Sequence, residues 1–213
     1  KMKKPLAGII NISINNILSI KRALEFVGFN TIIINEDQNT DKLDLLVLPG
    51  VGAFNEAMKT LNDTNLIKTI DKYLNNNKNF LGICLGMQLL FKESNEFTKT
   101  NGIGFFEDKI ESFENYLFYK KTFIGWNKVK FKENFFDDKD QLNLLQNKKF
   151  YFVHSFFANC KNEKIIGGNS FNGKLNFTSI VKKNKVTAFQ FHPEKSGKNG
   201  LSLLNSVTKN IFL

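Results

Sequence analysis

The segment with the most reactive chemistry is FLGICLGMQLLF, residues 80–91, where an apolar run leads into a cysteine between two glycines. Gly82 and Gly86 each stand two residues from Cys84, and small residues there permit the sharp strand-to-helix turn of a nucleophile elbow. A helix N-terminus at the cysteine would favour its thiolate, because the helix dipole and free N–H groups stabilise negative charge. A buried structural cysteine is the alternative interpretation, and the pattern favours a catalytic thiol.

A thiolate that attacks a carbonyl carbon needs a group that moves protons, and this group must itself be oriented. The sequence contains two histidines. His192 lies in FQFHPEKSG after an apolar run, and Glu194 follows it closely enough to hold the imidazole. His154, in YFVHSF, is the rival base, but no acidic residue lies within several positions of it. We therefore predict a triad of Cys84, His192 and Glu194, with a packing role for His192 as the alternative.

A third segment, LPGVGAF at 48–54, could stabilise the charge that develops during such an attack. Gly50 and Gly52 follow an apolar run and leave backbone N–H groups accessible to a ligand, although a plain tight turn explains two glycines equally well. Ligands of open α/β sheets bind beyond the carboxyl ends of the strands. The N–H groups of Gly52 and Leu85 are predicted to form an oxyanion hole there.

The elements that position these residues follow from the spacing of apolar side chains. Short apolar runs alternate with helical periodicity in the first third of the chain, which is typical of βα units around a parallel sheet. Later runs are rich in phenylalanine and broken by Gly and Asn, which predicts a mixed or antiparallel portion. The expected fold is α/β: a mostly parallel central sheet flanked by helices, with an added mixed or antiparallel portion. The predicted strands are 6–12, 31–34, 45–48 and 79–83, and the predicted helices are 17–27, two stretches within 53–77 that separate near 63, and 200–212.

Composition narrows the class of protein further. A chain of 213 residues that is 42% hydrophobic can bury one large core, and we expect a single domain over 1–213. The net charge is +10, but the lysines are scattered and form no nucleic-acid-binding module, so no nucleic acid partner is expected. No apolar run is long enough for a membrane span or signal peptide, which predicts a cytoplasmic protein without a membrane partner.

The sequence also predicts that no metal or cofactor is bound. The two histidines and the two cysteines, Cys84 and Cys160, lack any zinc spacing, and we expect both thiols to be reduced. No phosphate-binding glycine motif follows a strand, so no nucleotide is expected.

Five segments in this order and spacing resemble the class I glutamine amidotransferases, of flavodoxin-like architecture, and among them the family of glutaminase subunits of imidazole glycerol phosphate synthase. These segments are LPGVGAF, GICLGMQLLF, GWN, YFVHSF and QFHPEKSG, and the resemblance covers nearly the whole chain. It implies hydrolysis of L-glutamine to glutamate and ammonia by Cys84, His192 and Glu194. It also implies that Gly52 and Leu85 form the oxyanion hole. The substrate-binding residues that it implies are Gly50, Gln88, Glu96, Ser155 and Phe156.

The resemblance further implies a (β/α)8-barrel cyclase subunit, which receives the ammonia in a heterodimer and makes imidazole glycerol phosphate and AICAR in histidine biosynthesis. Asn16 and Trp126 would lie at that interface. The segment 11–20 and the pair Phe123 and Ile124 depart from the family pattern, where the family has an Asp-Tyr-Gly turn and His-Met. Four alternatives stay open: a paralogue that supplies ammonia to another acceptor such as a surface sugar, another class I amidotransferase, a hydrolase of another substrate, and a catalytically silent binding module.

Overall fold

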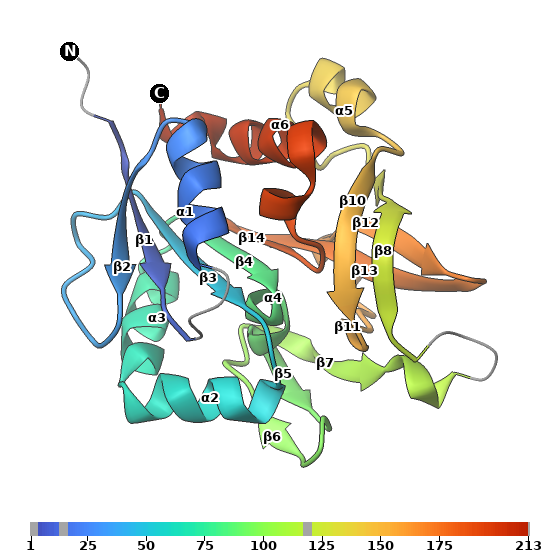
Figure 1. Cartoon of the computed structure of the whole chain (residues 1–213), viewed down its shortest axis with the longest axis horizontal. Helices are drawn as coiled ribbons and strands as arrows, with labels where there is room; N and C mark the ends of the chain where they lie inside the picture. The colour runs from blue at the N-terminus through green and yellow to red at the C-terminus, as the bar shows by residue number, and fades with distance from the viewer. Residues whose placement is uncertain (1–3, 13–16, 117–120, 213) are drawn as a thin grey trace.

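The computed structural model describes residues 4–12, 17–116 and 121–212 (Figure 1). Helices and strands alternate through the first half of the chain, and strands dominate the second half. The helices are α1 Ile17–Phe26, α2 Phe54–Asp63, α3 Leu66–Asn75, α4 Leu85–Leu89, α5 Lys139–Leu145 and α6 Gly197–Thr208, with short 3₁₀ turns at Phe113–Asn115, Glu163–Ile165, Pro193–Lys195 and Lys209–Ile211. The strands are β1 Leu6–Ile10, β2 Asn30–Ile34, β3 Leu45–Gly50, β4 Phe80–Cys84, β5 Phe91–Ser94, β6 Thr100–Asn101, β7 Phe106–Ser112, β8 Phe123–Lys128, β9 Lys130–Phe131, β10 Lys149–His154, β11 Phe156–Ala158, β12 Ile166–Asn172, β13 Leu175–Lys183 and β14 Val186–Phe189.

A parallel block of five strands, in the order β2-β1-β3-β4-β14, forms one half of the main sheet. From β14 the sheet continues through the antiparallel strands β13, β11 and β7, and β7 in turn pairs in parallel with β5. This mixed architecture confirms the predicted fold class, including the change of pattern in the second half of the chain.

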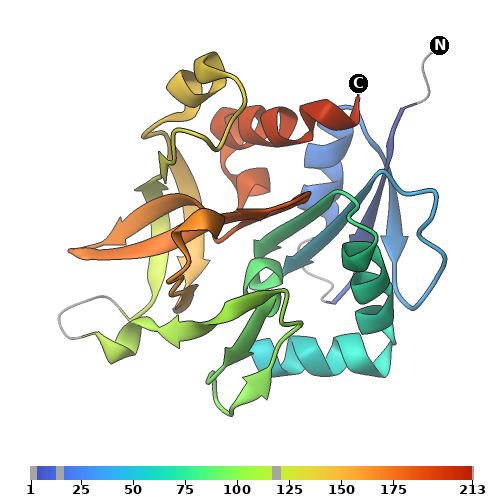
Figure 2. The same ribbon diagram turned by 180° about the vertical axis from the view of Figure 1, so that it is seen from behind.

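Strand β3 shows why helices must cover both faces of the parallel block. Leu45 and Val47 pack in the same apolar cluster as α1 and α6, whereas Leu46 and Leu48 pack in the cluster that contains α2 and α3. Successive side chains of a strand point to opposite faces, so a strand with apolar residues at every position has to be buried on both sides. Figures 1 and 2 show these helix pairs on opposite sides of the sheet.

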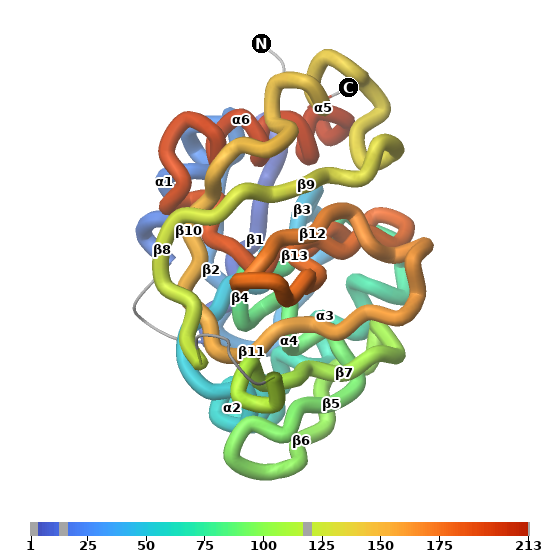
Figure 3. The backbone as a smooth tube through the Cα atoms, turned by 90° about the vertical axis from the view of Figure 1, so that its right-hand side faces the viewer, coloured from blue at the N-terminus to red at the C-terminus, as the bar shows by residue number. Residues whose placement is uncertain are grey.

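The phenylalanines of the second half join a small second sheet to the main one. Strands β8 and β10 pair antiparallel with each other and run past β12 and β13 (Figure 3). Phe152 of β10 lies with its ring centroid 6.0 Å from that of Phe177 on β13 and 5.3 Å from that of Phe191. Because buried aromatic rings contribute large apolar areas, this cluster fixes β10 against the end of β14.

Most predicted elements are present with small shifts at their ends. The break between the two predicted helices of 53–77 is confirmed, since α2 ends at Asp63 and α3 begins at Leu66 after Asn65 with φ 54°. The first strand ends at Ile10 and not at residue 12, and the last helix begins at Gly197. None of the described helices is long and apolar enough to cross a membrane.

Candidate active site

Cys84 ends β4 and directly precedes α4, in a backbone conformation that few residues adopt. Its φ is 54° and its ψ is −112°, a strained combination for a residue with a side chain. The flanking glycines permit the turn. A Cβ at Gly86 would overlap the Leu48 carbonyl oxygen of β3, and one at Gly82 would lie 3.0 Å from the Ala188 Cβ of β14. The turn therefore holds the cysteine at the tip of β4, as a nucleophile elbow does.

The register of the parallel strands gathers the predicted residues at one edge. Gly50 at the end of β3 is the partner of Cys84 at the end of β4, and Phe189 at the end of β14 is the partner of Ile83. The segment that follows β14 contains His192, so the cysteine and the histidine emerge from neighbouring strands. This carboxyl edge is the place where α/β sheets bind ligands.

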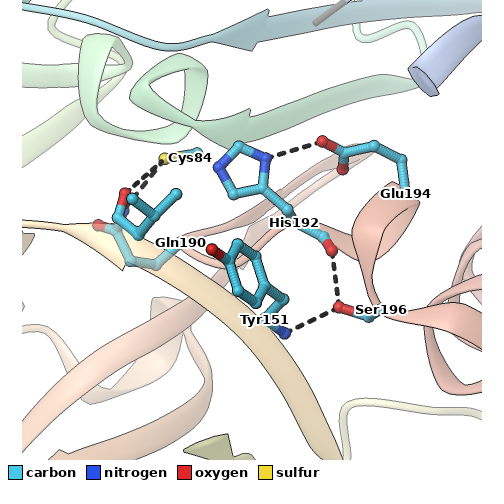
Figure 4. Close-up of polar contacts among 7 residues, drawn as sticks. Cys84, Tyr151, Gln190, His192, Glu194 and Ser196 are labelled. Carbon is cyan, nitrogen blue, oxygen red and sulfur yellow. Dashed lines mark hydrogen bonds and ion pairs between the residues drawn. The ribbon is translucent and has the colours of Figure 1, made fainter. Parts of the chain in front are cut away.

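His192 lies between the other two members of the predicted triad (Figure 4). Its Nδ1 is 2.7 Å from Oε1 of Glu194, and the side chains of both residues are fully buried. Burial opposes the imidazolium, but the Cys84 thiolate and the Glu194 carboxylate outweigh burial and raise the pKa of His192 to about 10. The geometry therefore favours an imidazolium that adjoins Cys84 and is oriented by a carboxylate.

The backbone of His192 is anchored to β10. Its N–H donates to the Tyr151 carbonyl at 2.9 Å. The Ser196 hydroxyl donates to the His192 carbonyl at 2.6 Å and accepts from the Tyr151 N–H at 2.9 Å (Figure 4). Ser196 thus ties the histidine to the strand whose end forms the opposite wall of the site.

A cavity of about 260 Å³ opens beside Cys84. Among the predicted residues, Gly52, Leu85, Gln88, Glu96, Ser155 and Phe156 line it together with Cys84. Gly50 is buried beneath it, where a Cβ would lie 3.0 Å from the Leu85 Cβ, and does not line it. Four further residues line the cavity that were not predicted as site residues: Val51, Thr122, Val153 and His154. Val51 and His154 directly adjoin predicted positions in the sequence.

Three polar side chains that line the cavity, those of Gln88, Glu96 and Ser155, make hydrogen bonds within the protein. The Gln88 amide nitrogen donates to the Phe156 carbonyl at 2.8 Å, and Glu96 Oε2 accepts from the Phe54 N–H at 2.8 Å. Burial raises the pKa of Glu96, while the bond from Phe54 opposes that rise. The Ser155 hydroxyl lies 2.8 Å from that of Thr122. No group of three or more His, Cys, Asp or Glu side chains in the described ranges is arranged to hold a metal ion.

His154, the rival base, makes its hydrogen bond to the backbone of Phe156. Its Nδ1 lies 2.8 Å from the Phe156 carbonyl and therefore carries the proton, while its buried Nε2 has no hydrogen-bond partner. Burial lowers the pKa of His154 to about 4, and the nearby charge of His192 adds to the effect of burial. Between about pH 4 and about pH 10, His154 is consequently neutral while His192 is protonated.

This neutral burial predicts a stability loss in acid. The folded-state pKa of about 4 lies below the ordinary histidine pKa of 6.5, so between these pH values the unfolded chain binds a proton that the folded protein does not. The free energy of unfolding should fall as the pH decreases through that window, by about 3 kcal/mol from this group alone. In urea unfolding, the stability advantage of wild type over His154→Gln should shrink by this amount from about pH 7 to about pH 4.

Phe131→Leu provides the control for the acid experiment, because it removes buried apolar area without a titrating group. Its cost should be the same at both pH values. An equally constant difference for His154→Gln would contradict the neutral burial of His154.

Of the two predicted interface residues, the structure describes Trp126 but not Asn16. Trp126 of β8 is half exposed, and its ring centroid lies 6.0 Å from that of Tyr151 in an edge-to-face contact. Ile124, on the same strand, is 65% exposed. Asn16 lies outside the described residues. The exposed apolar side chains of β8 are thus available on the surface, close to the Tyr151 segment of the site.

Comparison with known proteins agrees with this geometry. Residues 8–209 match the family described as Glutamine amidotransferase class-I. Imidazole glycerol phosphate synthase subunit HisH of Sulfurimonas denitrificans is 38% identical over 208 residues, covering 96% of this chain and 98% of that protein. The subunits of the same name from Aquifex aeolicus and Thermotoga maritima are 39% and 36% identical, covering 93% and 94% of both chains, respectively.

Solved structures support the fold. A structure of PurLQS from Thermotoga maritima superposes with a TM-score of 0.78 at 17% identity and covers 98% of this chain and 99% of that one. A structure described as a glutamine amidotransferase gives 0.70 at 17% identity, covering 97% and 99%. Given the match over residues 8–209 and the curated relatives, the protein belongs to the class I glutamine amidotransferase family.

Proposed function

We propose that the chain hydrolyses L-glutamine through Cys84, His192 and Glu194. His192 Nε2 accepts the thiol proton, and Cys84 Sγ attacks the side-chain carboxamide. The same imidazolium then protonates the departing nitrogen, which leaves as ammonia, and water releases glutamate from the thioester. The observation that supports this most directly is the buried His192–Glu194 pair at 2.7 Å beside a cysteine at the tip of β4.

The other residues receive roles from their places around the cavity. Gly52 and Leu85 supply backbone N–H groups to the oxyanion, a contribution of about 3 kcal/mol per donor in enzymes of this kind. Gln88, Glu96 and the backbone of Ser155 and Phe156 bind the amino-acid portion of glutamine. Gly50 acts indirectly, by bringing the Gly52 turn close to Cys84.

We further propose that residues 1–213 form one glutamine amidotransferase type 1 domain that works as a subunit. Its ammonia would pass to a (β/α)8-barrel cyclase subunit that makes imidazole glycerol phosphate and AICAR in histidine biosynthesis. The names of the relatives, which are subunits of imidazole glycerol phosphate synthase, and the exposed Trp126 support this assignment. Asn16 is the other proposed contact.

Stimulation by the partner is the test of this assignment. We expect slow glutamate release by the purified chain alone, and strong stimulation when a cognate barrel subunit and its ribulosyl phosphate intermediate are added, because the partner completes the oxyanion hole. Equal rates with and without the liganded partner would leave a glutaminase that serves another acceptor, such as a surface sugar. That outcome fits the departures at Phe123 and Ile124. No glutamate release under either condition would overturn the glutaminase function itself.

A further inference from the structure

Gln190 is a buried carboxamide that the proposed reaction does not use. It lies one residue beyond the end of β14 and has no exposed surface. Its amide nitrogen is 3.9 Å from Cys84 Sγ, and its amide oxygen accepts from the Gln88 nitrogen at 3.0 Å. Figure 4 shows Gln190 on the side of Cys84 away from Glu194. One side chain therefore contacts both the nucleophile and a residue of the cavity wall.

The Phe156 carbonyl determines the orientation of both carboxamides, those of Gln88 and Gln190. The Phe156 carbonyl can only accept hydrogen bonds, and it accepts from Gln88 Nε2 at 2.8 Å and from His154 Nδ1 at 2.8 Å. Gln88 must therefore turn its nitrogen toward Phe156. The same nitrogen faces Gln190, so Gln190 must present its oxygen to Gln88 and its nitrogen to the sulfur, since a flipped amide would oppose two donors.

This orientation of the two amides has consequences for Cys84 and for Gln88. At Cys84, a thiol can donate to the Val153 carbonyl at 3.8 Å, whereas a thiolate can only accept, and Gln190 offers it an N–H. Hydrogen bonds to the charged form of a group stabilise that form. At Gln88, both N–H groups are committed to the protein, so its carbonyl oxygen remains as the acceptor that this amide offers to a ligand in the cavity.

We propose that Gln190 is a positioning residue that supplies an N–H donor to the Cys84 thiolate and holds the Gln88 amide with its oxygen toward the substrate. The first role concerns Cys84 alone, and the second rests on the proposed use of glutamine. Among the residues that the structure describes, the other titratable groups around the sulfur or the cavity are His192, Glu194, His154 and Glu96. None of them is altered by the substitutions below.

The first experiment follows alkylation of Cys84 by iodoacetamide against pH, read by mass spectrometry of the Cys84 peptide so that Cys160 does not contribute. Gln190→Glu keeps an oxygen for Gln88 but replaces the donor at the sulfur with a negative charge. A like charge beside an ionisable group disfavours its charged form, so alkylation near neutral pH should slow about 10-fold and its pH profile should move to higher pH. Gln190→Leu removes the donor without adding a charge and should give a smaller shift in the same direction.

Gln146→Leu is the matched control. Gln146 also makes two hydrogen bonds through its amide, which accepts from the Phe131 N–H and donates to the Phe131 carbonyl, and it does not line the cavity. Its loss should lower the free energy of unfolding without changing the alkylation profile. Profiles of Gln190→Glu and Gln190→Leu that coincide with wild type would overturn the role of Gln190 at the thiolate, whatever their stability.

The second experiment separates the substrate role from the glutaminase assignment. Gln190→Leu should lower kcat by no more than it slows alkylation of Cys84. Its KM for glutamine should rise by a larger factor, because Gln88 is no longer held in place. An unchanged KM would overturn that half of the proposal. Because alkylation needs no glutamine, the thiolate role remains testable even if the wild-type chain releases no glutamate.

Discussion

Replacement of Cys84 by alanine is expected to lower glutamate release by at least about 10⁴-fold. In the proposed reaction the sulfur forms the thioester, so the substitution removes the nucleophile and leaves the His192–Glu194 pair in place. Glutamate release should be measured with the liganded barrel subunit present, so that the wild-type rate is at its maximum. Cys160→Ala is the matched control, because this half-buried thiol lies outside the site and its loss should leave the rate unchanged. Retention of more than a few per cent of the rate in Cys84→Ala would exclude the thioester mechanism.

The backbone of Cys84 adds a stability readout to the same position. Because φ 54° and ψ −112° are strained for any residue with a Cβ, Cys84→Gly should be more stable than Cys84→Ala by about 1 kcal/mol, although we expect both to be inactive. Ala57→Gly within α2 should show the opposite sign, since glycine destabilises a helix by about 1 kcal/mol. Urea unfolding of the three variants makes the comparison. Greater stability of Cys84→Ala than of Cys84→Gly would mean that the elbow stores no strain.

Gly86→Ala is expected to be the most damaging single-methyl substitution near the site. Its Cβ would overlap the Leu48 carbonyl oxygen and lie 2.6 Å from the Leu48 carbonyl carbon, and neither backbone atom can move without β3. Overpacking of this kind costs at least about 3 kcal/mol, and relief requires α4 to move away from β3. That movement also displaces the Leu85 N–H, so glutamate release should fall together with the free energy of unfolding.

The control for Gly86→Ala is Gly104→Ala. Gly104 has φ +73°, and its added Cβ would meet no atom within 4 Å, so only the left-handed backbone opposes the substitution. We expect a loss of about 1 kcal/mol in urea unfolding and an unchanged rate of glutamate release. If both variants lost the same stability, close packing of α4 on β3 would not be the reason for glycine at position 86.

The helical elements of the first half of the chain were predictable because their signals are local. The helix of α1 ends at Phe26, two residues before Gly28, and α2 and α3 separate where the apolar periodicity is interrupted. The segment after Cys84 was less predictable. Its apolar run continues as a helix only to Leu89 and then becomes β5, because Phe91 pairs with Phe106 of β7. A buried helix and a buried strand look alike in a short apolar run.

Within the candidate site, the parts whose geometry is local could be predicted from the sequence. Glycines two residues on either side of Cys84 define the elbow, and a spacing of two lets Glu194 reach His192 within one turn. The same local information failed for Gln190 and Ser196. Both belong to the selected QFHPEKSG segment, but their roles come from hydrogen bonds to Gln88, Cys84 and Tyr151, which lie at least 45 positions away.

The charge state of each histidine could not be predicted from the sequence, because it is set by the packing of distant strands. The parallel register of β4 and β14 brings His192 to Cys84, while the aromatic cluster around β10 removes His154 from water. Charge states depend on burial and on neighbouring charges, and these arise only when distant strands pack together. The reactive groups of this protein could therefore be predicted from its sequence. The packing of its sheet sets their pKa values and their positions relative to one another.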